Sequence, residues 1–191
     1  MNRHQIINYL IKNNDYSRYL EIGVQKGHSF KKVICDHKDG VDPKPKSKKV
    51  SIDYIMTSDD FFNTIPSSQK YDIVFIDGLH EKDQVLADVR NSLDHLIDGG
   101  TIVLHDCNPE SERMARLDRN GTVWEAVVEL RKDVNLNVKV VDDDFGVGIV
   151  TIGSQEVLDI PEDVEVTYDF LDSDRNNILN LISVEDFKKE F

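Results

Sequence analysis

A glycine turn followed at a set distance by an acid constrains this chain more than any other feature. Residues 19–29 read Tyr-Leu-Glu-Ile-Gly-Val-Gln-Lys-Gly-His-Ser, and residues 40–43 read Gly-Val-Asp-Pro. An apolar strand, a glycine turn, a helix and a second strand that ends in an acid form one unit of a parallel sheet. Asp42 lies 19 residues after Gly23, close to the offset of about 20 at which an acid meets ribose hydroxyls in such units. The pattern predicts a cleft for a ribose-bearing cofactor.

The spacing of the glycines indicates which cofactor this is. A dinucleotide fingerprint, G-x-G-x-x-G, needs its second glycine so that the backbone can approach a pyrophosphate. Here Gln25 stands at that place, and the spacing is Gly23-x-x-x-Gly27. S-adenosylmethionine has ribose and adenine but no phosphate, so this turn favours it. An ordinary tight turn would explain the glycines but not the acid after the second strand.

The overall composition excludes several classes of protein. The 191 residues carry a net charge of −13, which would repel the phosphate backbone of a nucleic acid. The N-terminus lacks the apolar run of a signal peptide and no stretch resembles a membrane span, so we expect a cytoplasmic protein with no membrane partner. Cys35 and Cys107 form no CxxC pair, and we expect both to be buried, inert thiols. The length predicts a single domain over residues 1–191.

Apolar periodicity predicts alternating strands and helices. The predicted strands cover residues 18–23, 40–42, 50–56, 71–77, 101–105, 138–141 and 147–152, and the last two form an antiparallel hairpin. The predicted helices cover residues 2–13, 29–36, 82–97, 121–132, 168–182 and 184–191, and a further capped helix begins near Ser58. This order predicts an α/β fold with a doubly wound, mostly parallel sheet of about seven strands that ends in the hairpin.

With the glycine turn and Asp42, the chain resembles the class I S-adenosylmethionine-dependent methyltransferases, which have a Rossmann-like fold. The resemblance covers about residues 17–152 and is strongest at residues 21–29, at residues 41–43, and at residues 71–77 together with 99–106. More narrowly, the chain is similar to the small bacterial O-methyltransferase-like branch, which is related to the metal-assisted catechol and macrolide-sugar O-methyltransferases. Gln25 departs from the glycine of many class I members, but it suits this narrower branch.

The resemblance implies roles for residues of the glycine turn. The backbone from Gly23 to Gly27 would pass along the methionine part of S-adenosylmethionine. Ser29 would lie near the carboxylate of that methionine. Glu21 would either order the turn or reach the amino group of the cofactor.

The rest of the cofactor would lie against the neighbouring strand ends. Asp42 would accept hydrogen bonds from both ribose hydroxyls, which suits a carboxylate because it offers two acceptor oxygens. Ser58 would contact the adenine, although it could equally be a simple helix cap. Asp77, at the end of another strand, is expected to contact the cofactor as well as to take part in the chemistry.

Two acid–histidine pairs follow adjacent strands of the predicted sheet. Asp77 and His80 follow the strand at 71–77, and His105 and Asp106 end the strand at 101–105. Because adjacent parallel strands end side by side, these pairs should face each other across the cleft. His80 is the candidate base because its ordinary pKa is close to working pH. For His105 we expect a core histidine that donates to a backbone carbonyl.

The related metal-assisted enzymes hold Mg²⁺ with carboxylates on these strand ends. Asp77 and Asp106 match two of those positions and are candidate ligands for a divalent cation. Where catechol-type enzymes follow the second acid with asparagine, this chain has Cys107, a poor ligand for Mg²⁺. The cation site is therefore an open expectation.

Residues 107–120 are longer than an ordinary connection between a strand and a helix, which is typical of a lid. Arg113, Arg116 and Arg119 recur at intervals of three and would share one side of a helical lid. Arginine suits carboxylate and phosphate groups, so the loop predicts an anionic acceptor. The alternative is that these arginines pair with neighbouring acids on the solvent face. We expect the lysine-rich residues 44–49 to be a solvated loop.

Two other functions would fit the glycine turn. A short-chain NAD-dependent oxidoreductase would carry a Tyr-x-x-x-Lys pair, and none of the six tyrosines has a lysine four residues on. A non-catalytic S-adenosylmethionine-binding or scaffold protein would not need the acid–histidine pairs. The sequence therefore predicts methyl transfer to a hydroxyl oxygen of a small polar molecule. It does not name that acceptor, and it leaves the oligomeric state open, a homodimer included.

Overall fold

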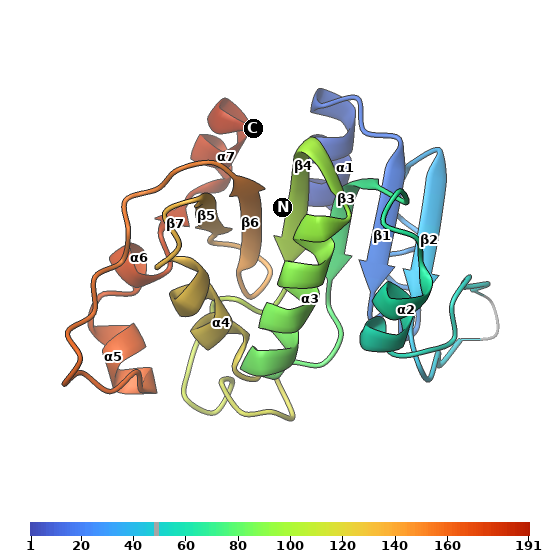
Figure 1. Cartoon of the computed structure of the whole chain (residues 1–191). Helices are drawn as coiled ribbons and strands as arrows, with labels where there is room; N and C mark the ends of the chain where they lie inside the picture. The colour runs from blue at the N-terminus through green and yellow to red at the C-terminus, as the bar shows by residue number, and fades with distance from the viewer. Residues whose placement is uncertain (48–49) are drawn as a thin grey trace.

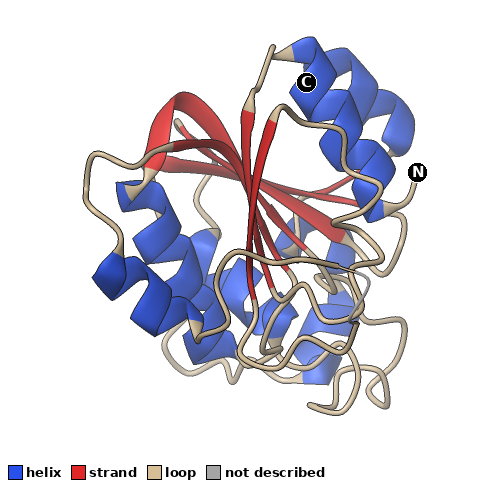
Figure 2. Ribbon diagram, turned by 90° about the vertical axis from the view of Figure 1, so that its right-hand side faces the viewer, coloured by secondary structure: helices blue, strands red, loops and turns tan. Residues whose placement is uncertain are grey.

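The computed structural model describes residues 1–47 and 50–191 and shows a seven-stranded sheet with helices on both sides (Figures 1 and 2). The strand order is β2-β1-β3-β4-β6-β5-β7. Neighbours among β2, β1, β3 and β4 are parallel, while β6 runs antiparallel to β4 and to β5. The strands are β1 (Arg18–Ile22), β2 (His37–Val41), β3 (Tyr71–Ile76), β4 (Leu96–Leu104), β5 (Leu136–Val141), β6 (Val147–Ile152) and β7 (Leu181–Ile182). The predicted α/β class, mostly parallel sheet and terminal hairpin are confirmed.

Two helix layers cover the two faces of the sheet. The helices are α1 (Arg3–Asn13), α2 (Ser58–Thr64), α3 (Lys82–Asp94), α4 (Val123–Leu130), α5 (Tyr168–Ser173), α6 (Arg175–Ile178) and α7 (Val184–Glu190). Helices α1 and α7 share one apolar cluster with the sheet, and α2 to α6 share the other. Within the described residues, no helix has the length and apolar character that crossing a membrane requires.

Helix α1 begins where its sequence caps it. Asn2 accepts a hydrogen bond from the Gln5 amide, and the Gln5 side chain accepts one from the Asn2 amide, which together form a capping box. Ile6, Ile7 and Leu10 of this helix are fully buried against the sheet. The cap and the buried face together fix the first turn of α1 above the carboxyl ends of the central strands.

The pairing of β3 with β4 positions the candidate site. All six residues of β3 are buried, as expected for a strand covered on both faces. Ile76 lies opposite Leu104, and the His105 amide donates to the Ile76 carbonyl at 3.2 Å. The residues that follow, Asp77 on one strand and His105 on the other, therefore leave the sheet side by side.

The helix predicted at residues 29–36 is wrong, because this segment forms turns. Its backbone carbonyls are taken by side chains from elsewhere in the chain. Lys38 Nζ donates to the carbonyls of Phe30 and Val33, and the Asn8 side chain donates to the carbonyl of Lys32. These contacts replace the hydrogen bonds that a longer helix would need.

Two predicted helices end earlier than expected. Helix α3 ends at Asp94, and Leu96, placed on the helix by its apolar character, instead pairs with Tyr71 and opens β4. The helix predicted over 168–182 divides into α5 and α6 and gives way to β7. Asn180 adopts a φ of +50°, and its side chain donates to the Val138 carbonyl, which turns the chain into the sheet.

The strand expected at 50–56 reduces to a single bridge between Tyr54 and Val41. The predicted loop at 44–49 is irregular where the structure describes it, and its residues 48 and 49 lie outside the described part of the chain. Cys107 is fully buried as predicted, but Cys35 is only half-buried.

Candidate active site

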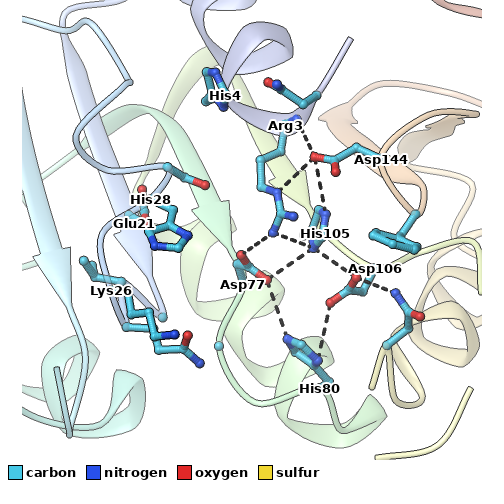
Figure 3. A pocket seen from close by; sticks show the side chains of 18 of the residues that line it. Arg3, His4, Glu21, Lys26, His28, Asp77, His80, His105, Asp106 and Asp144 are labelled. Atoms are coloured by element: carbon cyan, nitrogen blue, oxygen red, sulfur yellow. Dashed lines mark hydrogen bonds and ion pairs between the residues drawn. The ribbon is translucent and has the colours of Figure 1, made fainter. Parts of the chain in front are cut away.

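The carboxyl ends of β1, β3 and β4 border two adjoining cavities of about 520 and 380 Å³. Both cavities are lined by Gly23, Gln25, Asp77 and Gly78. The larger cavity extends beneath the start of α1 and past the acid–histidine pairs (Figure 3). The smaller cavity lies between the end of β2 and the start of α2. Together they have the size of a site for a small-molecule ligand and a second reactant.

The glycine turn packs directly against the end of β3. Gly23 has a φ of +92°, and a Cβ atom there would lie 2.2 Å from the Asp77 carbonyl oxygen. Gln25 also adopts a left-handed conformation, with φ +47°, although it carries a side chain. Its amide donates to Asp42 Oδ2 at 2.6 Å, so the acid of the second strand holds the turn in place. The other oxygen of Asp42 accepts from the Lys44 amide at 2.7 Å.

Glu21 lies at the wall of the larger cavity and is only 2 % exposed. Burial raises its pKa to about 8, although hydrogen bonds from the Tyr19 hydroxyl and the Phe30 backbone favour the charged form. The distance from Tyr19 Oη to Glu21 Oε2 is 2.5 Å. Phe30 lies beyond the turn from Gly23 to Gly27, so both predicted roles of Glu21 stay predictions. Ser29 is also buried and lines the same cavity.

A buried histidine stands among three carboxylates in this cavity (Figure 3). His105 Nδ1 lies 3.1 Å from Asp106 and 3.4 Å from Asp77, and its Nε2 lies 3.6 Å from Asp144. Burial lowers the pKa of His105, but these carboxylates outweigh burial and raise it well above its usual value. Arg3 Nη1 also lies 3.1 Å from this Nδ1, and the contact is a hydrogen bond in the tautomer whose Nδ1 carries no proton. The predicted hydrogen bond from His105 to a backbone carbonyl is wrong.

Arg3 reaches the same cluster from the first turn of α1. Its Nη1 donates to Asp77 Oδ2 at 3.0 Å, and its Nε donates to Asp144 Oδ2 at 3.0 Å. Burial raises the pKa of Asp77, but hydrogen bonds from His105 and His80 and the charge of Arg3 hold it well below its usual range. Hydrogen bonds from His105 and Arg3 hold the pKa of Asp144 below its usual range in the same way, although burial raises it.

His80 is held by the loop that follows β4. Its Nδ1 donates to the Arg119 carbonyl at 2.7 Å, which leaves Nε2 as the nitrogen able to accept a proton. Asp77 and Asp106 lie 3.6 and 3.4 Å from the ring. Burial lowers the pKa of His80, but the contacts with Asp77, Arg119 and Asp106 raise it above its usual value. Gly121 permits this packing, since a Cβ atom there would lie 2.0 Å from the His80 carbonyl.

Two carboxylates of the cluster sit on strained backbone. Asp106 has a φ of +62° and Asp144 a φ of +48°, in the left-handed region that residues with side chains seldom adopt. Asn120 donates to Asp106 Oδ1 at 2.5 Å and fixes its carboxylate. Left-handed residues of this kind cluster at functional sites, where the surrounding structure compensates their cost.

Of three comparisons with known proteins, two find matches. Residues 20–107 match the family model of a methyltransferase domain, and no curated protein matches the chain. Residues 20–107 thus match a methyltransferase domain, and the fold is that of solved methyltransferases.

Solved structures with the same fold have low sequence identity. A methyltransferase from Podospora anserina in complex with S-adenosylhomocysteine has a TM-score of 0.62 and 16% identity, with 81% of this chain and 78% of that chain covered. A putative caffeoyl-CoA O-methyltransferase from Staphylococcus aureus has a TM-score of 0.63 and 17% identity, with 78% and 82% covered. An O-methyltransferase from Bacillus cereus, also in complex with S-adenosylhomocysteine, has a TM-score of 0.58 and 12% identity, with 80% of each chain covered.

The structure brings together the residues that the sequence singled out around the strand ends. Ligand atoms of Asp77, His80 and Asp106 all lie within 4.8 Å of one another. Asp42 and Ser58 line the smaller cavity, but the cap of α2 is Thr57 and not Ser58. The roles of these residues in the methyltransferase stay predictions.

Sequence reasoning missed Arg3 and Asp144. Arg3 begins the lead-in helix, and Asp144 lies in the turn between β5 and β6. Arg3 follows no strand, so no rule about strand ends selects it. Asp144 follows β5, which runs in the direction of β4 because both strands are antiparallel to β6. An arginine and an acid placed 141 residues apart become partners only when α1 docks against the hairpin.

The predicted lid at residues 107–120 folds as a series of turns and not as a helix. Arg113, Arg116 and Arg119 lie around a separate cavity of about 240 Å³, and only Arg119 also lines the larger cavity. Arg116 contacts Asp118 at 3.4 Å, which fits the solvent-face alternative for that residue.

The carboxylates of the acid–histidine pairs fit Mg²⁺ poorly as they stand. All four carboxylate oxygens of Asp77 and Asp106 lie within 3.6 Å of a nitrogen atom of the protein. The third candidate donor is an imidazole, whereas Mg²⁺ prefers oxygen. Cys107 is buried with its thiol 3.8 Å from the His105 carbonyl, so it supplies no ligand here. An ion would have to displace contacts that the protein already makes.

The raised pKa of Glu21 predicts how stability changes with pH. Since Glu21 is protonated up to about pH 8 when folded but only to about 4.5 when unfolded, its contribution is complete below pH 4.5 and is lost as pH rises through 8. Glu21→Gln should therefore become more stable relative to the parent protein between pH 5 and pH 8, by roughly 3–5 kcal/mol. Urea unfolding at several pH values measures this. The exposed Glu110→Gln is the control, and equal pH profiles for Glu21→Gln and the parent would contradict the assignment.

Proposed function

We propose that this methyltransferase transfers the methyl group of S-adenosylmethionine to a hydroxyl oxygen of a small anionic molecule. One observation carries the proposal: Asp77 forms part of the wall of both cavities and contacts His80 and His105. A cofactor bound along the glycine turn would therefore present its reactive end to the acid–histidine pairs.

The smaller cavity suits the adenosine part of the cofactor. The Asp42 carboxylate is fixed by two backbone amides and, with two lone pairs on each oxygen, can still accept from the ribose hydroxyls. Ser58 and the buried Asp88 lie farther along the same wall, beside the expected place of the adenine. Burial raises the pKa of Asp88 to about 6, and Gln84 donates to its Oδ1 at 3.1 Å.

The methionine part would follow the turn from Gly23 to Gly27 into the larger cavity. Ser29 and Glu21 line that cavity next to the turn. Glu21 has no salt-bridge partner among the described residues, so a cofactor ammonium group would supply the positive charge that its buried carboxyl lacks. This is the second of its predicted roles.

His80 would act as the general base. Bound S-adenosylmethionine supplies an electrophilic methyl group on a positively charged sulfur. The acceptor oxygen forms a bond to this carbon as the bond from carbon to sulfur breaks, and the bonding electrons remain on sulfur. His80 Nε2 takes the proton of the hydroxyl, while Asp77 and Asp106 orient the ring and stabilise its positive charge.

The rim of the larger cavity supports an anionic acceptor. His4, Lys26, His28, Lys32 and Arg119 all line it, although the protein as a whole carries a charge of −13. Among the described residues, the side chains of Lys26 and Lys32 have no ion-pair partner, so they are available to a ligand. Arg113 and Arg116 do not line this cavity, so Lys26 and Lys32 take the place of these lid arginines in the proposed binding of an anion.

Replacement of Asp42 tests the cofactor site. Asp42→Ala should weaken binding of S-adenosylmethionine at least about tenfold, because it removes charge-assisted hydrogen bonds to the ribose. Isothermal titration calorimetry measures this, with thermal unfolding to check that each variant is folded. Asp36→Ala, exposed just before β2, is the matched control and should bind as the parent does. Tight binding of NAD instead of S-adenosylmethionine would refute the cofactor assignment.

Replacement of His80 tests the chemistry. His80→Gln should lower the rate of methyl transfer by about 10²–10⁴-fold, the usual contribution of a general base, and leave the affinity for S-adenosylmethionine nearly unchanged. The assay follows radiolabelled methyl groups into a panel of small hydroxylated anions. His37→Gln at the exposed start of β2 is the control. An unchanged rate in His80→Gln would reject the base.

Charge reversal at Lys32 tests the class of acceptor. Lys32→Glu should raise KM for a hydroxy acid roughly fivefold while leaving KM for the corresponding neutral amide nearly unchanged, since only the acid meets the changed charge. The neighbouring Lys31 is exposed and lines neither cavity, so Lys31→Glu is a matched control. Equal changes in KM for the acid and the amide would show that Lys32 does not recognise an anion.

A further inference from the structure

A guanidinium group lies inside the acidic cluster at the carboxyl edge of the sheet (Figure 3). Arg3 donates through Nη1 to Asp77 and through Nε to Asp144, both at 3.0 Å. Its backbone amide also donates to Asp144 Oδ2, at 2.8 Å. Arg3 thus joins two carboxylates that belong to different strand ends.

The position of Arg3 is fixed by the fold and not by the length of its side chain alone. It is the first residue of α1, directly after the capping box formed by Asn2 and Gln5. The buried face of α1 anchors the helix, and the terminal amino group of Met1 contacts Asp143 in the hairpin turn. The guanidinium is therefore held at a preorganised place before any ligand binds.

Part of the guanidinium remains available. Arginine carries five N–H donors, and the two on Nη2 make no hydrogen bond to any residue that the structure describes. The side chain is 26% exposed and lines the larger cavity together with His80. A ligand oxygen next to His80 can therefore meet a permanent positive charge.

A divalent cation and a guanidinium would do the same work at this place. Each would balance the negative charge of Asp77 and its neighbours, and each would stabilise the charge that develops on an acceptor oxygen. An ion between Asp77 and Asp106 would lie close to Arg3, and the two positive charges would repel each other in a partly buried site.

We propose that Arg3 takes the place of a divalent cation in this methyltransferase, with Nη1 and Nε holding the acidic cluster and Nη2 holding the acceptor oxygen. The proposal about the acceptor rests on the proposed function, whereas the proposal about the ion does not. Methyl transfer then proceeds without a metal ion. The proton of the acceptor still goes to His80, and Arg3 keeps all of its own protons.

Binding of Mn²⁺ tests whether Arg3 occupies the place of a divalent cation, and this test needs no acceptor. Electron paramagnetic resonance measures free Mn²⁺ in the presence of the parent protein, Arg3→Ala and the control Lys12→Ala, which lies exposed on the same helix. The parent and Lys12→Ala should bind Mn²⁺ weakly, and Arg3→Ala should bind it at least about tenfold more tightly because two carboxylates lose their partner. Adding Asp77→Asn to Arg3→Ala should abolish that gain. Tight binding by the parent that depends on Asp77 would overturn the proposal, as would no gain in folded Arg3→Ala.

Two further measurements separate this proposal from its rivals. The affinity of Arg3→Ala for S-adenosylmethionine should stay within about twofold of the parent, and a tenfold loss would assign Arg3 to the cofactor and overturn the proposal. Once an acceptor is known, the parent should keep its full rate in a chelator while Arg3→Ala loses at least about tenfold. Loss of the parent's rate in chelator would overturn the proposal. A failure to find any acceptor would count against the proposed function alone, because the Mn²⁺ result does not depend on it.

Discussion

The pairing of β3 with β4 places Ile76 opposite Leu104, so Asp77 and His105 leave the sheet as neighbours in a partly buried space. An unpaired carboxylate at such a place would cost several kcal/mol, and so would an unpaired imidazolium. The rest of the site follows from this constraint. Asp106, Asp144 and Arg3 supply the opposite charges that make the arrangement stable.

This compensation ties distant parts of the chain together. Asp144 comes from the turn of the β5–β6 hairpin, and Arg3 comes from the start of α1. Each contacts the other and the strand ends at the same time. Removing one partner of a buried ionic network leaves the others uncompensated, so the cluster holds the lead-in helix and the hairpin against the carboxyl edge of the sheet. The larger cavity is thereby lined by residues as far apart in the sequence as Arg3 and Asp144.

Much of this arrangement could be predicted from local patterns, and the rest could not. Asp42, Asp77 and Asp106 follow apolar strands, and parallel strands bring their carboxyl ends to one edge whatever the details of packing. Arg3 has no such signal, since a helix N-terminus shows nothing of what it will dock against. The turns at residues 29–36 could not be predicted either, because they depend on a contact with another segment. Lys38 donates to backbone carbonyls that a helix would otherwise use.

In the proposed function, the close approach of Gly23 to Asp77 would join cofactor binding to catalysis. The turn that would carry the methionine part of the cofactor presses on the Asp77 carbonyl, with no room for a side chain between them. Asp42 holds that turn through the Gln25 amide, and the carboxylate of Asp77 meets Arg3 on its other side. A shift of the cofactor's ribose at Asp42 would therefore reach the acidic cluster through two contacts. One joins Asp42 to the Gln25 amide, and the other is the close approach of Gly23 to Asp77. In a reaction that depends on aligning an oxygen with a methyl group, such a chain of contacts limits misplacement of either reactant.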